Sequence, residues 1–211
     1  MRDGRPDRHA RLDRHARLDR RALVGGILER RGDAAVVAGL GSPAWDCHAA
    51  GDSPLNFYFW GAMGGAAMLG LGVALAQPAR RVLVVTGDAE MLMGVGSLAT
   101  IAAQAPSNLA LLVLDNEAFG ETGCQAGLTG GKTDIAAIAR GAGIDAAFTV
   151  GGEVGEGSAR TDVEALAGTL FAEEGPVLCV AKIALSAESG SYPPRDGVLL
   201  QARFRAALAG G

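Results

Sequence analysis

Two side chains with metal-binding oxygens, Asp88 and Asn116, follow apolar segments that are typical of buried strands. VLVVT (82–86) runs into Gly87-Asp88, and LALLVL (109–114) runs into Asp115-Asn116, which places Asn116 28 residues after Asp88. If the two segments are neighbouring parallel strands, their ends lie roughly 5 Å apart. A carboxylate, an amide oxygen and phosphate oxygens together form the all-oxygen shell that Mg²⁺ prefers. The pair predicts a magnesium and diphosphate site, although each residue alone would also suit a cap or turn.

Glycine makes up 32 of the 211 residues, about twice the usual share of roughly 7%. No collagen-like or linker-like repeat accounts for this number, so many glycines are expected at tight turns and close backbone approaches. Gly61, Gly64, Gly65 and Gly87 stand where they would let backbone amides approach a diphosphate.

Apolar segments alternate with amphipathic ones along the chain, which predicts an α/β fold with a doubly wound, mostly parallel sheet. Continuous β-branched and leucine runs are typical of strands that are covered on both faces. The predicted strands are 34–38, 82–86, 109–114, 146–150 and 177–182. The predicted helices are 20–31, 61–76 (fully buried), 92–105, 134–141 and 162–173, with long loops at 39–59 and 115–132.

The length suits one domain of 20–190, preceded by a flexible arginine-rich extension of 1–19 and followed by a tail of 191–211 with a short helix. Residues 1–31 hold ten of the nineteen basic residues and five acidic ones, and include a duplicated RHARLD. The remaining residues carry nine basic and eighteen acidic side chains, a net charge of −9. Such a body repels phosphate backbones, so we expect no nucleic acid as a partner.

The three cysteines, Cys47, Cys124 and Cys179, are widely spaced and form no CxxC pair, which favours a reducing, cytoplasmic location. The first residues are charged and do not resemble a secretory signal. Residues 53–79 contain no charged side chain, but proline, asparagine and glutamine interrupt them. A membrane span needs about 20 predominantly apolar residues, so we expect a buried helix and no membrane contact.

Longer stretches of the sequence resemble a known family. PLNFYFWGAMGGAAMLGLGVALAQP, GSLATIAAQAPSNLALLVLDNEAFGETG and DIAAIARGAGID are similar to the small, beta-type subunit of phosphonopyruvate and sulfopyruvate decarboxylases. The resemblance covers roughly residues 34–183 and includes the thiamine diphosphate motif, here Gly87-Asp88-Ala89-Glu90 to Asp115-Asn116. It implies a domain that binds the diphosphate of thiamine diphosphate through Mg²⁺. Ala89 replaces the usual third glycine, which requires a negative φ at that position.

The resemblance also implies a role for individual residues. Asp88, Asn116 and the carbonyl of Ala118 would hold Mg²⁺. Met63 would wedge between the cofactor rings, and Glu121 would lie close to the substrate, which makes these two the expected catalytic residues. The whole predicted cofactor-binding set is Gly61, Ala62, Met63, Gly64, Gly87, Asp88, Ala89, Glu90, Asn116, Ala118, Phe119 and Gly120.

Members of this family activate the cofactor with a glutamate on a separate pyrimidine-binding domain, for which these 211 residues leave no room. The resemblance therefore implies a pyrimidine-binding partner subunit, a hetero-oligomer, and a lyase (carboxy-lyase) activity on a 2-oxo acid. The same cofactor chemistry would also serve acyl transfer or aldehyde oxidation.

Two alternatives lie outside this activity. One is a non-catalytic subunit that keeps the thiamine diphosphate fold. The other is an NAD-binding Rossmann protein, because residues 94–99 match GxGxxA, with Asp115 nineteen residues after Gly96. That fingerprint belongs directly at a strand end, whereas here Gly94 comes eight residues after Thr86.

Overall fold

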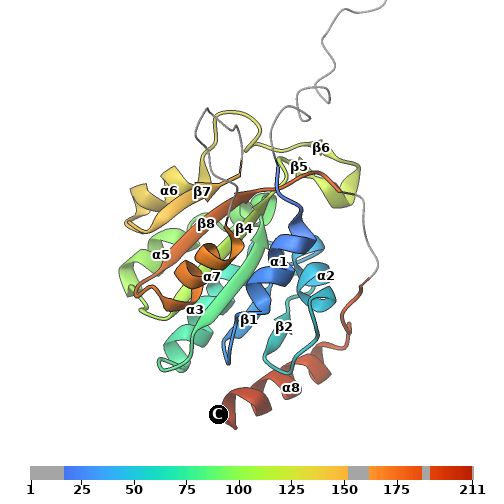
Figure 1. Cartoon of the computed structure of the whole chain (residues 1–211), viewed down its shortest axis with the longest axis vertical. Helices are drawn as coiled ribbons and strands as arrows, with labels where there is room; N and C mark the ends of the chain where they lie inside the picture. Colours follow the sequence, from blue (N-terminus) through green and yellow to red (C-terminus); the bar gives the residue numbers. More distant parts are fainter. Residues whose placement is uncertain (1–16, 152–161, 187–190, 211) are drawn as a thin grey trace, which may run out of the picture.

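The central element of the molecule is a six-stranded parallel sheet in the order β2-β1-β3-β4-β8-β7. The computed structural model describes residues 17–151, 162–186 and 191–210 (Figure 1). The strands of this sheet are β1 (Ala35–Ala38), β2 (Asn56–Tyr58), β3 (Val82–Gly87), β4 (Leu109–Asp115), β7 (Ala147–Val150) and β8 (Val177–Lys182). A second, two-stranded sheet pairs β5 (Ala118–Phe119) with β6 (Gln125–Ala126).

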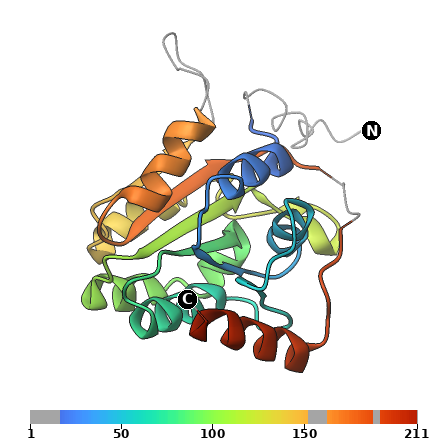
Figure 2. The same cartoon turned by 60° about the horizontal axis from the view of Figure 1, so that its bottom comes forward.

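Helices cover both faces of the large sheet, as Figure 2 shows, which confirms the predicted doubly wound α/β fold. One face packs against α1 (Arg20–Leu28), α2 (Ser42–Ala49) and α7 (Val163–Ala172). The other packs against α3 (Ala66–Ala76), α5 (Ser97–Gln104) and α6 (Ile135–Ala142). The remaining helices are α4 (Asp88–Met93), the 3-10 turn η2 (Gly120–Thr122) and α8 (Gly197–Ala209).

The strands follow the predicted segments because their apolar runs are buried on both faces. Every residue of β1 and β4 is buried, as are all residues of β3 except Gly87. Successive residues of each strand face opposite sides of the sheet, and helices cover both sides. The strands therefore do not show the alternation of apolar and polar residues that a half-exposed strand would have. The continuous apolar runs therefore predict these strands to within one or two residues.

The long loop predicted at 39–59 is wrong, because the segment contains α2 and β2. The helix is only eight residues long, begins with proline in its first turn, and is too short to show a clear helical period. The strand has three residues and pairs only with β1. Elements this short carry little signal in the sequence.

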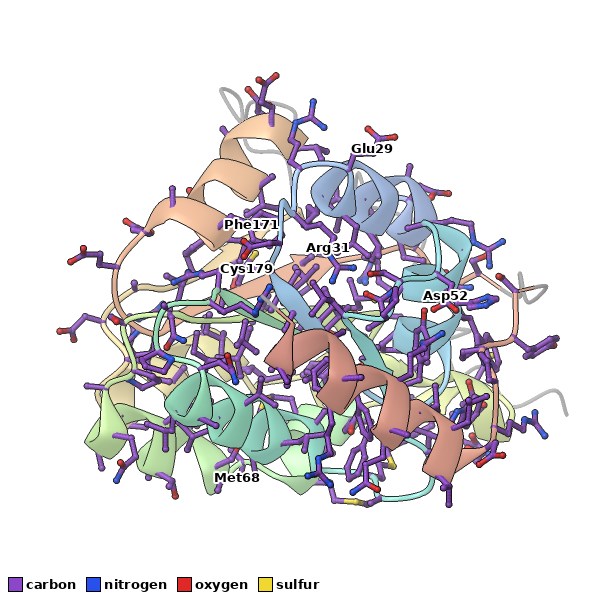
Figure 3. The ribbon with its side chains drawn as sticks, turned by 90° about the horizontal axis from the view of Figure 1, so that it is seen from below. Glu29, Arg31, Asp52, Met68, Phe171 and Cys179 are labelled. Atoms are coloured by element: carbon purple, nitrogen blue, oxygen red, sulfur yellow. The ribbon has the colours of Figure 1, made fainter. Side chains whose placement is uncertain are left out.

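The helix predicted at 61–76 begins only at Ala66, because Gly61 and Gly64 have φ angles of 80° and 92°. It is also not fully buried. Met68 and Leu75 are 43% and 51% exposed, and Figure 3 shows Met68 pointing outward from α3. In the described part of the chain, the structure contains no helix that is long and apolar enough to cross a membrane.

The helix predicted at 92–105 is divided into α4 and α5, which are separated at Gly94–Gly96. The predicted loop at 115–132 includes the small β5–β6 sheet and η2. At the end of the chain, α8 has 13 residues and is not short. Its buried Leu200 and Phe204 belong to the core, and it packs against the edge strand β2.

The chain enters the domain before residue 20. Leu18 forms a parallel bridge with Ile183, and Asp19 caps α1 by accepting a hydrogen bond from the amide of Ala22 at 2.7 Å. Residues 17–19 therefore belong to the folded domain, whereas residues 1–16 of the predicted extension lie outside the described residues.

Candidate functional site

The carboxyl ends of β3 and β4 lie side by side, as the sequence predicts. The two strands are parallel neighbours, and their register pairs Gly87 with Leu114. Asp88 and Asp115 therefore leave the sheet at the same level, and Asn116 follows one residue later. This edge carries the small β5–β6 sheet, at the top of the view in Figure 1.

Asp88 is the first residue of α4, and its carboxylate is buried. The hydroxyl of Thr129 lies 3.0 Å from Asp88 Oδ2 and 2.7 Å from Asp115 Oδ1. Burial, together with the negative charge of Asp115, raises the pKa of Asp88 from 3.8 to about 6. A buried carboxylate in this environment favours a bound cation, because a positive charge would stabilise its ionised form.

Residues 115–118 form a tight turn in which two side chains bind the backbone. The Glu117 amide donates to Asp115 Oδ1 at 3.0 Å, and the Ala118 amide donates to Asn116 Oδ1 at 2.9 Å. Glu117 lies in the left-handed region, with a φ of 59°. A Cβ at Gly120 would lie 3.5 Å from Asn116 Nδ2, so this side chain lies over the following turn.

A carboxylate, an amide oxygen and a peptide carbonyl are all ligands that suit Mg²⁺. The described residues contain no cluster of three or more His, Cys, Asp or Glu side chains that could hold a metal ion. That observation does not test the predicted set, in which only Asp88 is one of these residue types. The chemistry of Asp88, Asn116 and Ala118 therefore fits a cation that also takes ligands from a diphosphate.

Basic side chains that the sequence analysis missed lie beside this turn. Lys182 Nζ lies 2.7 Å from Asp115 Oδ2 and 3.0 Å from Glu117 Oε1, and Arg17 Nη2 lies 2.7 Å from Glu117 Oε2. Burial lowers the pKa of Lys182, but hydrogen bonds and charge from Asp115 and Glu117 outweigh it and raise the pKa overall. The sequence held a signal for Lys182, because a charged residue that ends a buried strand is expected at the site. It held no signal for Thr129, whose hydroxyl contacts Asp88 and Asp115.

The predicted cofactor loop at 61–65 makes a close backbone contact that requires glycine at position 94. A Cβ at Gly94 would lie 2.1 Å from the carbonyl oxygen of Gly64, so the loop at 61–65 rests directly on the break between α4 and α5. The Ala62 carbonyl accepts from the Gly65 amide at 3.1 Å, and Met63 on the same turn is 38% exposed. Gly94 therefore ends α4 and does not follow a strand, which removes the geometric basis for a Rossmann fingerprint.

Ala89 and Glu90 follow Asp88 in α4. Ala89 is not among the described residues with positive φ, so alanine is compatible with this position as expected. Thr86 Oγ1 donates to Glu90 Oε2 at 2.8 Å, and a Cβ at Gly39 would lie 1.9 Å from that oxygen. Burial raises the pKa of Glu90, although Thr86 and nearby backbone amides, including that of Gly64, favour the charged form. The buried Glu90 side chain thus lies beside the backbone of the predicted cofactor loop.

The expected substrate-side residues lie on the outer part of the same edge. Phe119 is 39% exposed, and Gly120 and Glu121 are exposed on η2. A Cβ at Gly41 would lie 2.4 Å from Glu121 Oε1. Because Gly41 is the N-cap of α2, the Glu121 carboxylate lies beside the positive end of that helix.

The fold is an α/β domain in which glycine loops and side chains with metal-competent oxygens meet at the carboxyl ends of parallel strands, where such domains bind their ligands. The chain belongs to the thiamine pyrophosphate enzyme family, since residues 43–181 match the thiamine pyrophosphate enzyme, C-terminal TPP binding domain. Thiamine diphosphate is therefore the cofactor for which this type of domain is built.

Relatives agree with this assignment. Sulfopyruvate decarboxylase subunit beta of Methanothermobacter thermautotrophicus is 46% identical over 100 residues, which are 47% of this chain and 52% of the relative. Phosphonopyruvate decarboxylase of Streptomyces hygroscopicus is 42% identical over 179 residues, or 84% of this chain and 42% of the relative. The chain thus spans about half the length of these relatives.

A solved structure supports the fold. Benzoylformate decarboxylase from Polynucleobacter necessarius superposes with a TM-score of 0.66 at 16% identity, covering 88% of this chain and 36% of that one. At this level of identity the likeness concerns the fold alone.

Proposed function

We propose that this chain is the diphosphate- and magnesium-binding subunit of a thiamine-diphosphate-dependent 2-oxo acid decarboxylase. The observation that carries the proposal is the pair Asp88 and Asn116 at the ends of neighbouring parallel strands β3 and β4. The names of the relatives, sulfopyruvate and phosphonopyruvate decarboxylases, support a 2-oxo acid as the substrate class.

In this proposal the chain contributes binding and orientation. Asp88, Asn116 and the Ala118 carbonyl hold Mg²⁺ against the diphosphate, with the Gly87 amide and the Phe119–Gly120 turn beside them. When bound, thiamine diphosphate supplies a nucleophilic carbon for the 2-oxo carbonyl and an electron sink for the loss of carbon dioxide.

The loop before α3 would serve the aminopyrimidine end of the cofactor. The carbonyl of Gly61 would accept a hydrogen bond from the exocyclic amine of the cofactor, and the Met63 side chain would pack against it. The Glu121 carboxylate, at the exposed edge, orients the substrate. The rigidity of this loop is supported by its close backbone contact with Gly94.

A second chain would complete the site. Met63, Met93 and Phe119 are 38%, 65% and 39% exposed around the cofactor loop and the metal turn. Large exposed apolar side chains beside a polar site are typical of a subunit interface. A pyrimidine-binding partner that covers this face would supply the activating glutamate and exclude water. Free thiols at Cys47, Cys124 and Cys179 support a cytoplasmic location for the assembly.

Cofactor-dependent stabilisation of the purified chain tests the binding half of the proposal. Thiamine diphosphate with MgCl₂ should raise the melting temperature, whereas thiamine diphosphate with EDTA, or NAD with MgCl₂, should not. Decarboxylation of a 2-oxo acid should appear only when the partner subunit is added. Stabilisation by NAD, or robust turnover by this chain alone, would contradict the proposal.

A further inference from the structure

Glu117 has an unusual backbone conformation for a residue with a side chain. It lies in the left-handed region with a φ of 59°, between the two proposed metal ligands Asn116 and Ala118. This region is sparsely populated by residues other than glycine, asparagine and aspartate, so the surroundings must hold it there. The functional proposal uses the residues on either side of Glu117 but does not use Glu117 itself.

Two basic side chains that are far apart in the sequence contact the two carboxylate oxygens of Glu117. Arg17 Nη2 lies 2.7 Å from Oε2, and Lys182 Nζ lies 3.0 Å from Oε1. Arg17, Glu117 and Lys182 expose only 8%, 13% and 20% of their side chains, so water screens these pairs less than it screens surface pairs.

The partners of Glu117 are themselves fixed to the strand next to β4. The amide of Leu18 donates to the Lys182 carbonyl at 3.1 Å, and the amide of Ala184 donates to the Leu18 carbonyl at 2.9 Å. These bonds tie the residue after Arg17 to the end of β8. The two cations are therefore held by backbone structure and do not depend on flexible side chains alone.

Asp115 has a supporting position in the same network. Its Oδ1 accepts from the Glu117 amide and from Thr129, and its Oδ2 accepts from Lys182 at 2.7 Å. Both oxygens of Asp115 are thus engaged within the protein, and the Thr129 hydroxyl also lies 3.0 Å from Asp88 Oδ2. Asp115 therefore links the backbone of the turn to Lys182 at the end of β8.

We propose that Glu117, anchored by Arg17 and Lys182, is a positioning residue that holds the left-handed turn through which Asn116 and Ala118 face one ion. The inference rests on the proposed function, because it concerns the same magnesium site. Partners that orient metal ligands from outside typically change metal affinity by about 10- to 100-fold when they are removed.

Glu117→Gln tests the inference, because it keeps the size of the side chain and removes its charge. Glu29→Gln is the control for loss of an exposed charge, since Glu29 is 75% exposed at the C-terminal end of α1, on the outer side of that helix in Figure 3. The affinity for Mn²⁺, a spin-active substitute for Mg²⁺, is measured by electron paramagnetic resonance on the full chain with saturating thiamine diphosphate and the partner subunit.

We expect the dissociation constant for Mn²⁺ to rise about 10-fold in Glu117→Gln and to stay unchanged in Glu29→Gln. The melting temperature of the metal-free chain should fall in Glu117→Gln, because a largely buried ion pair is broken, so the Mn²⁺ affinities are compared at a temperature at which both variants are folded. Arg17→Gln, at the edge of the network, should show a smaller rise in the same direction, and Arg17→Lys should restore part of the affinity.

Two results separate failure of this inference from failure of the proposed function. If the wild-type protein binds Mn²⁺ with thiamine diphosphate, but Glu117→Gln and Arg17→Gln bind it equally well, Glu117 has no positioning role. If Glu117→Gln does not fold, the Arg17 variants alone decide the matter. If the wild-type protein itself shows no thiamine-diphosphate-dependent binding of Mn²⁺, the proposed function is wrong and the inference fails with it.

Discussion

Asp88→Asn should stabilise the metal-free protein while it removes the magnesium site. Asparagine has nearly the same shape as aspartate and can still accept the hydrogen bond from Thr129. It carries no charge, and the charge of Asp88 is unfavourable where it is buried beside Asp115. The variant therefore separates the energetic contribution of the carboxylate from its contribution to packing.

The magnitude follows from the raised pKa. Because the folded-state pKa of Asp88 is about 6 against a reference of 3.8, the folded protein binds the proton more tightly than the unfolded chain. The resulting stabilisation is fully present below pH 3.8 and is lost as the pH rises through 6. At about 1.36 kcal/mol per pKa unit, the loss for this one group is on the order of 3 kcal/mol.

Urea denaturation in EDTA at pH 4 and at pH 7.5 measures the difference between wild type and variant. Asp88→Asn should have the larger free energy of unfolding at pH 7.5, by up to about 3 kcal/mol, and a much smaller advantage at pH 4. Saturating Mg²⁺ and thiamine diphosphate should stabilise only the wild type. Asp145→Asn, on an exposed loop position, serves as the control.

A variant that is less stable than the wild type in EDTA at pH 7.5 would refute this reasoning. So would a variant that retains the full magnesium-dependent stabilisation, because Asp88 would then not be a ligand.

Substitutions at three further positions test other parts of the site. Asn116→Ala should abolish magnesium-dependent binding of thiamine diphosphate in calorimetry, and Asn116→Asp should weaken it less, because it keeps an oxygen ligand. Gly94→Ala should lower the free energy of unfolding by about 1–3 kcal/mol in urea, since its Cβ would lie 2.1 Å from the Gly64 carbonyl oxygen. Met93→Ser should leave the melting temperature unchanged, because Met93 is 65% exposed, but should weaken the partner complex in analytical ultracentrifugation.

Each of these three expectations has a clear opposing result. Unchanged cofactor affinity in Asn116→Ala would mean that the metal lies elsewhere. Normal stability of Gly94→Ala would show that the loop at 61–65 can move away from α4. Normal partner affinity of Met93→Ser would indicate that this face is not the subunit interface; Ile138→Ser, on the exposed side of α6, is the control for a surface apolar residue.

Strands and long helices could be predicted because their signals are local. The apolar runs of β3, β4 and β8 are continuous, and each is bounded by polar or turn residues within a few positions. The helix predicted at 92–105 failed because its break depends on a distant group, the Gly64 carbonyl oxygen that excludes any side chain at Gly94. The elements between 39 and 59 failed because each is too short for its period to be visible.

The sequence by itself determined the α/β class and the placement of Asp88 and Asn116 at strand ends. Both follow from the order of residues within short segments, where hydrophobic burial and chain direction are local properties. Only the tertiary structure decided which side chains lie beside these two proposed ligands. In the chain, β7 precedes β8, but in the sheet β8 lies between β4 and β7. This order sets Lys182 beside Asp115 and Glu117, and brings Arg17 across 100 residues to the same turn. Such contacts depend on how strands pair in space, and no spacing along the chain reports that pairing.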